Sequence, residues 1–222
     1  MTPNRVYEKY LTKVEKNSTN DNFSTDKGKF KDLYNELSVR LIKFYLNNRN
    51  IDNLKDIQVL LVDDKSLTLD SSKDIYNLYK LPSNFLSWSY ARAKASKGKC
   101  KDKNISLYEI KDEDRADFLQ SSFYKPSFDY REVPYNFSED FLKVYKETGM
   151  DITKVFMTYY KYPTKIKLQD PENPESDFED TVIKLPEHIV DRIVSAMAGD
   201  FKISNSDPSF EGEKFRQNEN IQ

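Results

Sequence analysis

VFMTYYKY, residues 155–162, is the stretch that decides the fold of this chain, because large side chains fall on both of its faces. Successive side chains of a strand point to opposite faces, so Val155, Met157 and Tyr159 share one face, which we predict to be core. A half-buried strand alternates apolar with polar residues. The second face therefore has four possible neighbours: more core, a nucleic acid, a membrane or another protein chain. Pro163 donates no ladder hydrogen bond and marks the end of regular pairing or an edge position.

The two ends of the chain have helical periodicity. Apolar residues recur at helical spacing over 6–14 and again over 30–45, which predicts helices within residues 3–62. A last helix is predicted over 186–198, where Ile and Val form one stripe and a glycine follows.

The middle of the chain has extended periodicity, and a β-rich region is predicted over 74–185. A short helix with an acidic first turn is expected at 112–120, and ETGMD at 147–151 is expected to join two strands as a hairpin. The candidate strands are 74–82, 86–95 (where a helix is also possible), 105–110, 128–137, 140–147, 152–162 and 181–185.

The order is helices, then strands, then one helix, with no regular alternation, so a doubly wound parallel sheet is not expected. We predict a single α+β domain over 1–200. Its antiparallel β layers are sandwich-like with a protruding hairpin, and they are flanked by N-terminal helices and one C-terminal helix. Residues 201–222 are expected to form an extended or flexible tail, because they hold too few apolar groups to fold alone.

Composition narrows the class of protein. The net charge is −2, from 35 basic and 37 acidic residues, which argues against a dedicated nucleic-acid binder. Aromatic residues make up 14% of the chain, and tyrosine is common at interfaces. A single cysteine excludes an intrachain disulfide framework and fits a reducing compartment. No signal peptide and no membrane-spanning segment are recognised, so we expect synthesis in a cytoplasm and no membrane partner.

Enzyme motifs are mostly absent, so we expect no catalytic residue, no cofactor and no small-molecule substrate. No phosphate-cradling glycine motif occurs. His188 falls in the first turn of the last helix, without an obvious partner, and a surface or capping role is expected. One histidine and one cysteine cannot make a standard zinc site. The pair Asp63-Asp64 or the acidic residues of 112–117 could hold a catalytic metal, although such clusters are usually solvated turns and helix starts.

RAKASKGKCKDK, residues 92–103, is the most suggestive charge feature, because it places six cations between two predicted strands. A hairpin tip of this kind favours a phosphate backbone without reading sequence. No aromatic residue interleaves with the cations, so base stacking is not indicated. The plainer interpretation is a solvated loop beside the acidic stretch 112–117. The candidate DNA-contacting residues are Arg92, Lys94, Lys97, Lys99, Lys101 and Lys103.

Three stretches resemble the head-to-tail connector ring proteins of tailed bacteriophages, most closely those of crAss-like phages. They are KFKDLYNELSVRLIKFYL; LYKLPSNFLSWSYARAKASKGKC followed by ISLYEI; and VFMTYYKYPTKIKL, an acidic connector and TVIKLPEHIVDRIVSAMAGD. The resemblance is one of layout and soft motifs over residues 5–200. It implies no enzymatic activity. It implies a virion structural protein, an adaptor that forms a closed ring of about twelve subunits between portal and tail, through which DNA passes.

The resemblance also implies partners and contact residues. The partners are further copies of the chain, the portal protein, other connector or tail proteins and, transiently and without sequence preference, DNA. The candidates for subunit contacts are Tyr160, Tyr162, Phe201, Phe210 and Phe215. The alternative hypotheses are a free nucleic-acid-binding module that uses 92–103 and a metal-dependent hydrolase built on the acidic clusters.

Overall fold

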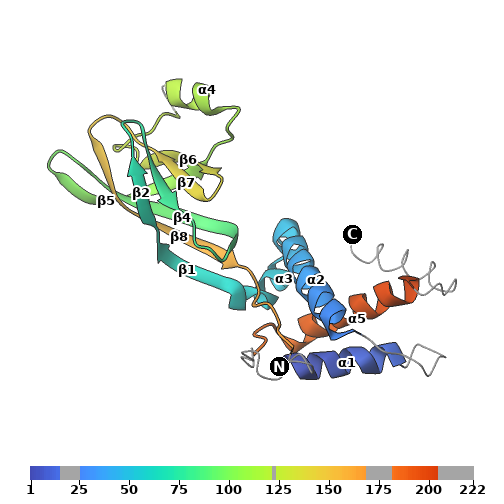
Figure 1. Ribbon diagram of the computed structural model, residues 1–222. Helices are drawn as coiled ribbons and strands as arrows, with labels where there is room; N and C mark the ends of the chain where they lie inside the picture. Colours follow the sequence, from blue (N-terminus) through green and yellow to red (C-terminus); the bar gives the residue numbers. More distant parts are fainter. Residues whose placement is uncertain (16–25, 122–123, 169–181, 205–222) are drawn as a thin grey trace. The chain divides into compact units, whose positions relative to one another are not determined.

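The computed structural model describes residues 1–15, 26–121, 124–168 and 182–204 (Figure 1). The chain forms two compact units. A helical unit combines Met1–Val59 with Pro163–Gln222, and a sheet unit comprises Leu60–Tyr162. The predicted α+β class, with helices from both ends of the chain and strands from its middle, is confirmed.

Among its described residues, the helical unit contains α1 (Pro3–Glu15), α2 (Lys27–Asn48), α3 (Ile51–Asp56) and α5 (Glu187–Ser204). Helices α1 and α2 lie where the periodicity predicted helices, and α5 runs past its predicted end at residue 198. The start of α2 is fixed by Asp26, whose side chain accepts a hydrogen bond from the backbone of Gly28 at 2.8 Å. Asn50 caps α3 in the same way, through the backbone of Asp52 at 2.9 Å.

The core of the helical unit is rich in aromatic rings. Helix α5 packs against both α1 and α2. Phe30 of α2 lies with its ring centroid 5.0 Å from that of Tyr7 and 5.2 Å from that of Tyr10, both on α1. From α5 the predicted stripe is buried, including Ile189 and Ile193. This packing joins the two ends of the chain into one unit.

The predicted strand at 181–185 is wrong within the described residues, because 182–185 belong to no sheet. Ile183 instead exchanges backbone hydrogen bonds with Met1, at 2.9 Å and 3.4 Å. The segment Val-Ile-Lys-Leu nevertheless alternates in burial: Ile183 and Leu185 are buried, and Val182 is exposed. An apolar alternation of this length fits an extended segment that lies on helices as well as it fits a strand.

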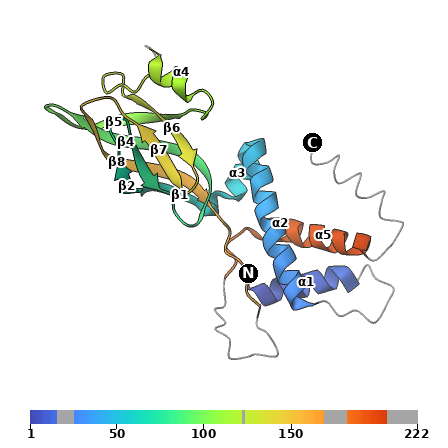
Figure 2. The ribbon, with the colours of Figure 1, turned by 45° about the horizontal axis from the view of Figure 1, so that its top comes forward.

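The sheet unit contains one mixed sheet of eight strands and the short helix α4 (Arg115–Gln120). Figure 2 shows the sheet and α4 from a second direction. The order is β1-β8-β4-β5-β6-β7-β3-β2, and every pairing is antiparallel except β5–β6. The strands are β1 (Leu61–Ser66), β2 (Thr68–Ser72), β3 (Tyr76–Lys80), β4 (Phe85–Lys97), β5 (Cys100–Glu109), β6 (Glu132–Ser138), β7 (Phe141–Tyr145) and β8 (Met150–Lys161).

The layers predicted as sandwich-like belong to this single sheet, which curls. Its two outermost strands, β1 and β2, are consecutive in the chain and are separated by Leu67 alone. The backbone N–H of Leu67 donates to the carbonyl of Val155 at 2.9 Å, which fixes the bend between them. A continuous stretch of chain therefore pairs with β8 at one end of the order and with β3 at the other.

The core of the sheet unit lies on the inner face of the curled sheet. Val155, Met157 and Tyr159 of β8 are buried there, which confirms the prediction for that face. On the neighbouring strand β4 the buried positions are Ala91, Ala93 and Ala95. Small residues on β4 leave room for the larger side chains that reach inward from other strands, as interior packing requires. Those include Tyr79, Tyr135 and Leu142, and Phe128 from the segment before β6 packs with them.

The predicted hairpin between 140–147 and 152–162 is wrong. Strand β7 pairs with β3 and β6, whereas β8 pairs with β1 and β4. The chain does turn at 147–149, where Gly149 has a φ of 78°, but the two strands separate after the turn. The reason is nonlocal: β8 follows the long strand β4 from Lys161 opposite Phe85 to Met150 opposite Lys97.

Candidate functional site

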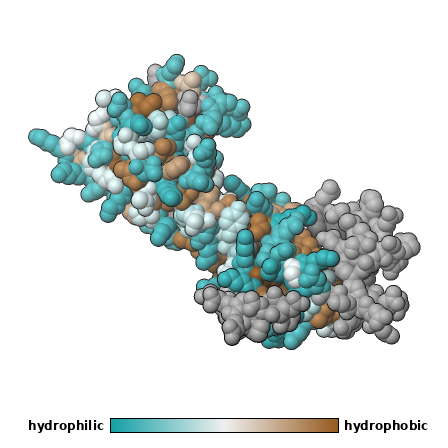
Figure 3. All heavy atoms as spheres, in the orientation of Figure 1, coloured by the Kyte–Doolittle hydropathy of each residue, from teal (hydrophilic) through white to brown (hydrophobic). Residues whose placement is uncertain are grey.

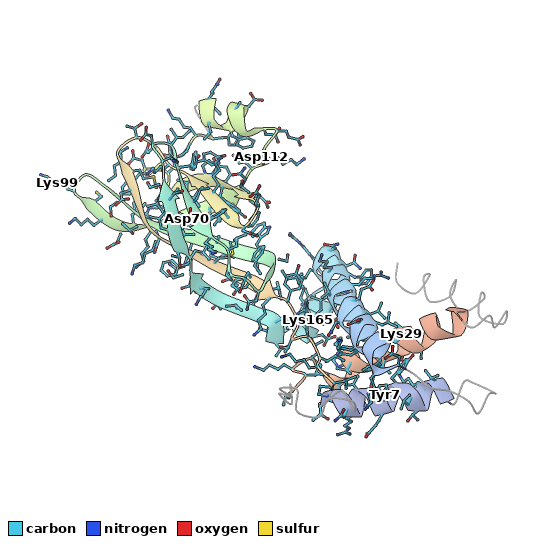
Figure 4. The ribbon with its side chains drawn as sticks, viewed as in Figure 1. Tyr7, Lys29, Asp70, Lys99, Asp112 and Lys165 are labelled. Carbon is cyan, nitrogen blue, oxygen red and sulfur yellow. The ribbon has the colours of Figure 1, made fainter. Side chains whose placement is uncertain are left out.

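The basic segment 92–103 forms the end of the β4–β5 hairpin. Its cations were predicted to lie between two strands, but five of the six lie on the paired strands and only Lys99 lies in the turn. Lys97 pairs with Cys100 across a two-residue turn, in which Gly98 has a φ of 57°. Glycine adopts a positive φ with less strain than other residues, which favours it at this turn position. Figure 4 shows Lys99 at the tip of the hairpin, which projects from the sheet.

Arg92 does not present its charge freely to solvent. Its Nε and Nη2 atoms donate to the two carboxylate oxygens of Asp64, at 3.0 Å and 2.5 Å, and its guanidinium lies 4.3 Å from the ring centroid of Phe156. The hydrogen bond to Asp64 is the main cause that raises the pKa of Arg92. A guanidinium held on two carboxylate oxygens and a ring is a structural group on the outer face of the sheet.

Lys97 and Lys103 are also held by the protein. The Nζ of Lys97 donates to Oε1 of Glu147 at 2.8 Å, and this hydrogen bond is the largest cause that raises the lysine pKa. The same carboxylate oxygen accepts the backbone N–H of Phe128 at 2.9 Å. Lys103 donates to the Phe128 carbonyl at 3.3 Å and lies 4.7 Å from the Phe128 ring centroid. These contacts tie the root of the hairpin to its neighbours.

The cations at the tip differ from those at the root. Lys99 and Lys101 are exposed, and the described residues include no ion pair with either of them. Lys94 is half-buried on β4, between Asn104 of β5 and Lys154 of β8. The structure therefore brings the six predicted cations together on one hairpin but leaves the two at its tip as the most accessible.

The predicted subunit-contact residues fall in two places. Tyr160 is half-buried on β8, opposite Leu61 and Ser87, and burial raises the pKa of its phenol. Tyr162 is 43% exposed, and its backbone N–H donates to the Asn84 carbonyl at 2.9 Å. Neither ring is buried within the described chain. The side chain of Phe201 and all of Phe210 and Phe215 lie outside the described residues.

The candidate chemical groups have structural partners. His188, expected without a partner, lies with Nε2 at 3.0 Å from Oδ2 of Asp56, because α3 and α5 meet in the helical unit. Asp63 accepts a hydrogen bond from Thr158 at 2.7 Å, and Asp112 accepts one from Asn136 at 2.5 Å. Within the described residues no group of three or more His, Cys, Asp or Glu side chains is arranged to hold a metal ion.

Sequence reasoning missed a cavity of about 230 Å³ in the sheet unit. Its walls include the rings of Tyr108, Phe118, Tyr124 and Tyr130, from β5, α4 and the segment before β6. The tyrosines at 124 and 130 are 60% and 79% exposed. The parallel pairing of β5 with β6 brings Tyr108 near these two tyrosines. No local sequence pattern indicates that pairing, so the cavity could not be predicted from the sequence.

Large apolar side chains are also exposed elsewhere on the sheet unit, and Figure 3 shows hydrophobic side chains scattered among hydrophilic ones on one face. They include Leu69, Ile75 and Tyr90. Single exposed apolar residues are ordinary, and a contact surface requires several that adjoin.

No helix in the described part of the chain is both long and apolar enough to span a bilayer. No protein-family model matches the sequence, and no curated protein is significantly similar to it.

Proposed function

We propose that the chain is a virion structural protein that assembles into a ring between the portal and the tail of a bacteriophage, around the path of the DNA. The observation that carries this proposal is the β4–β5 hairpin, whose root is locked by Asp64 and Glu147 while Lys99 and Lys101 stay accessible at its tip. A stiff arm with a few tip cations suits brief contact with passing DNA.

The charge distribution supports transient contact with DNA over stable binding. A protein that neutralises many phosphates gains affinity from each cation it commits. Here Arg92 and Lys97 are committed to carboxylates, and the chain as a whole carries a net charge of −2. A DNA passage needs a lining that does not hold the DNA in place.

The exposed rings support the assembly part of the proposal. A ring subunit uses two different lateral surfaces, since its contacts are head-to-tail, and it meets further partners above and below. Tyr90 and Tyr162 are exposed at 52% and 43% on the sheet unit. Tyrosine is enriched in such interfaces, because its ring packs while its hydroxyl tolerates water.

The test is a mass measurement of the purified chain, alone and mixed with the portal protein of the same virus. The proposal expects a complex with portal that contains roughly twelve copies, as a closed ring that matches the portal would. Some adaptors assemble only on the portal, so a monomer in isolation is compatible with the proposal. A chain that stays monomeric and is not retained by portal contradicts it.

The double variant Lys99→Ala/Lys101→Ala separates the ring from a free nucleic-acid-binding module. The ring proposal expects unchanged assembly with portal and at most weak DNA binding by the isolated chain. The alternative expects micromolar or tighter DNA binding that falls steeply with salt and is lost in the double variant. Lys97 and Lys103 are left intact, because they hold the hairpin root and their loss would confuse folding with binding.

A further inference from the structure

The cavity near α4 has walls that are mostly aromatic. The ring centroids of Tyr108 and Phe118 are 6.4 Å apart, and those of Phe118 and Tyr124 are 5.3 Å apart, with tilted planes. Tyr130 is the fourth aromatic residue of the lining. At about 230 Å³ the cavity is smaller than the roughly 300–1,000 Å³ of pockets for drug-sized ligands, so its size suits a small head group or a single side chain.

The walls are held in place by hydrogen bonds of the protein itself. The hydroxyl of Tyr108 donates to the backbone carbonyl of Tyr124, so its proton is already used and its ring is fixed. Ser127 and Glu132 exchange backbone hydrogen bonds at 2.9 Å and 3.1 Å. The backbone of Ser106 donates to the Arg131 carbonyl at 2.7 Å. The cavity is therefore formed before any ligand arrives, which lowers the entropic cost of binding.

The cavity lining holds one acidic residue, Glu132, and one basic residue, Lys125. The carboxylate of Glu132 lines the cavity, and burial together with the charge of Glu132 raises the pKa of Tyr108 to about 12. The segment 111–132 carries six acidic and four basic residues. The one basic side chain in the lining is that of Lys125, which is exposed.

We propose that this cavity binds an organic cation, either an alkylated ammonium or a guanidinium group, between its aromatic rings and the carboxylate of Glu132. The faces of aromatic rings carry negative potential and attract cations that are poorly hydrated, and groups of rings recognise quaternary ammonium ions in this way. The inference does not depend on ring assembly, because every residue that it uses belongs to one sheet unit.

An anionic ligand would have Lys125 as a basic partner in the lining, but it would also have to approach Glu132 and the ring faces. The proposed cation has two sources with the same chemistry: a free small ammonium ion, or the side chain of an arginine on another protein. Tetramethylammonium represents the first source. A glycine-flanked arginine tripeptide represents the second, and the same peptide with glutamine is its neutral control.

The experiment measures saturation transfer from the full chain to the ligand protons, and dissociation constants from the shifts of the backbone amides between Tyr124 and Glu132. Sodium chloride at equal ionic strength is the reference. Wild type is expected to bind at least one of the two cationic probes with millimolar affinity. Tyr130→Ala and Glu132→Gln should each weaken binding by about 3- to 10-fold. Lys125→Ala should tighten it, because a competing positive charge is removed.

Tyr90→Ala is the matched control, because Tyr90 is also an exposed tyrosine of the sheet unit but does not line the cavity. It should leave the dissociation constant unchanged. The proposal is overturned if neither cationic probe shows saturation transfer, or if Tyr90→Ala weakens binding as much as Tyr130→Ala does. It is also overturned if the charge effects are reversed, with Glu132→Gln tightening and Lys125→Ala weakening, since that pattern assigns the cavity to an anion.

Discussion

The two faces of β8 carry side chains of similar size, but different interactions hold them. On the inner face, Met157 packs into an apolar core beside the alanines of β4. On the outer face, Phe156 lies beneath the guanidinium of Arg92, which Asp64 holds in turn. The difference shows that large residues on both faces of a strand do not require two cores. A partly exposed ring can be covered by an arginine of the same chain.

Met157→Ala is expected to have the largest effect on stability. Met157 is 1% exposed, and truncating a buried methionine in a core costs about 2–5 kcal/mol of the free energy of unfolding, since a cavity remains. Urea denaturation followed by circular dichroism measures this loss. Thr158→Ala, one residue along on the outer face, is the control and should cost far less. Equal losses in the two variants would show that the faces do not differ as described.

Phe156→Ala should cost less than Met157→Ala. Phe156 is half-buried, so the transfer of its ring from water contributes about 0.8–1.5 kcal/mol, half of the value for a fully buried side chain. The same urea titration gives the number. If Phe156→Ala lowers the free energy of unfolding as much as Met157→Ala does, then more than the Arg92 side chain covers Phe156.

Two buried tyrosines sharpen the description of the inner face. The hydroxyl of Tyr79 donates to the Ile152 carbonyl at 3.2 Å, whereas the hydroxyl of Tyr135 has no hydrogen-bond partner among the described residues. Tyr79→Phe should therefore cost about 0.5–1.5 kcal/mol of the free energy of unfolding, and Tyr135→Phe should be neutral or stabilising. If Tyr135→Phe destabilises as much as Tyr79→Phe, the Tyr135 hydroxyl has a partner that is not described.

The same pair predicts a dependence on pH. Burial is the main cause that raises the pKa of both Tyr79 and Tyr135 above the usual value of 10.0. The folded state then keeps a proton that the unfolded state loses, so the stability from each phenol is complete below about pH 10 and falls as pH rises further. Thermal melts between pH 8 and 11 should show a smaller alkaline loss for Tyr135→Phe than for wild type. An identical loss would contradict the burial of that phenol.

Features that depend on local pattern could be predicted from the sequence. The buried face of β8, the helices and the hairpin at 92–103 each follow from side-chain spacing or from a turn glycine. Features that depend on pairing over long distances could not. A hairpin was expected at 147–151, but β8 pairs with the distant strand β4 and not with β7, which precedes it in the chain. Asp64 and Arg92 are separated by 28 positions, and only the sheet order brings them together.

Arg92→Lys is expected to have a small effect on stability, and its dependence on salt should reveal the cause. The planar guanidinium of Arg92 donates to both oxygens of Asp64 and at the same time covers the ring of Phe156. A lysine keeps the charge, but its compact ammonium cannot make both contacts. The side chains of Arg92 and Asp64 are 29% and 45% exposed, so water and ions screen the pair. The stability difference between wild type and Arg92→Lys should therefore shrink as sodium chloride rises. It should not vanish, because the contact with the ring is not purely ionic. If the difference vanishes completely in high salt, charge alone holds the outer face of β8. If salt leaves it unchanged, packing on Phe156 is the whole of the arginine's contribution.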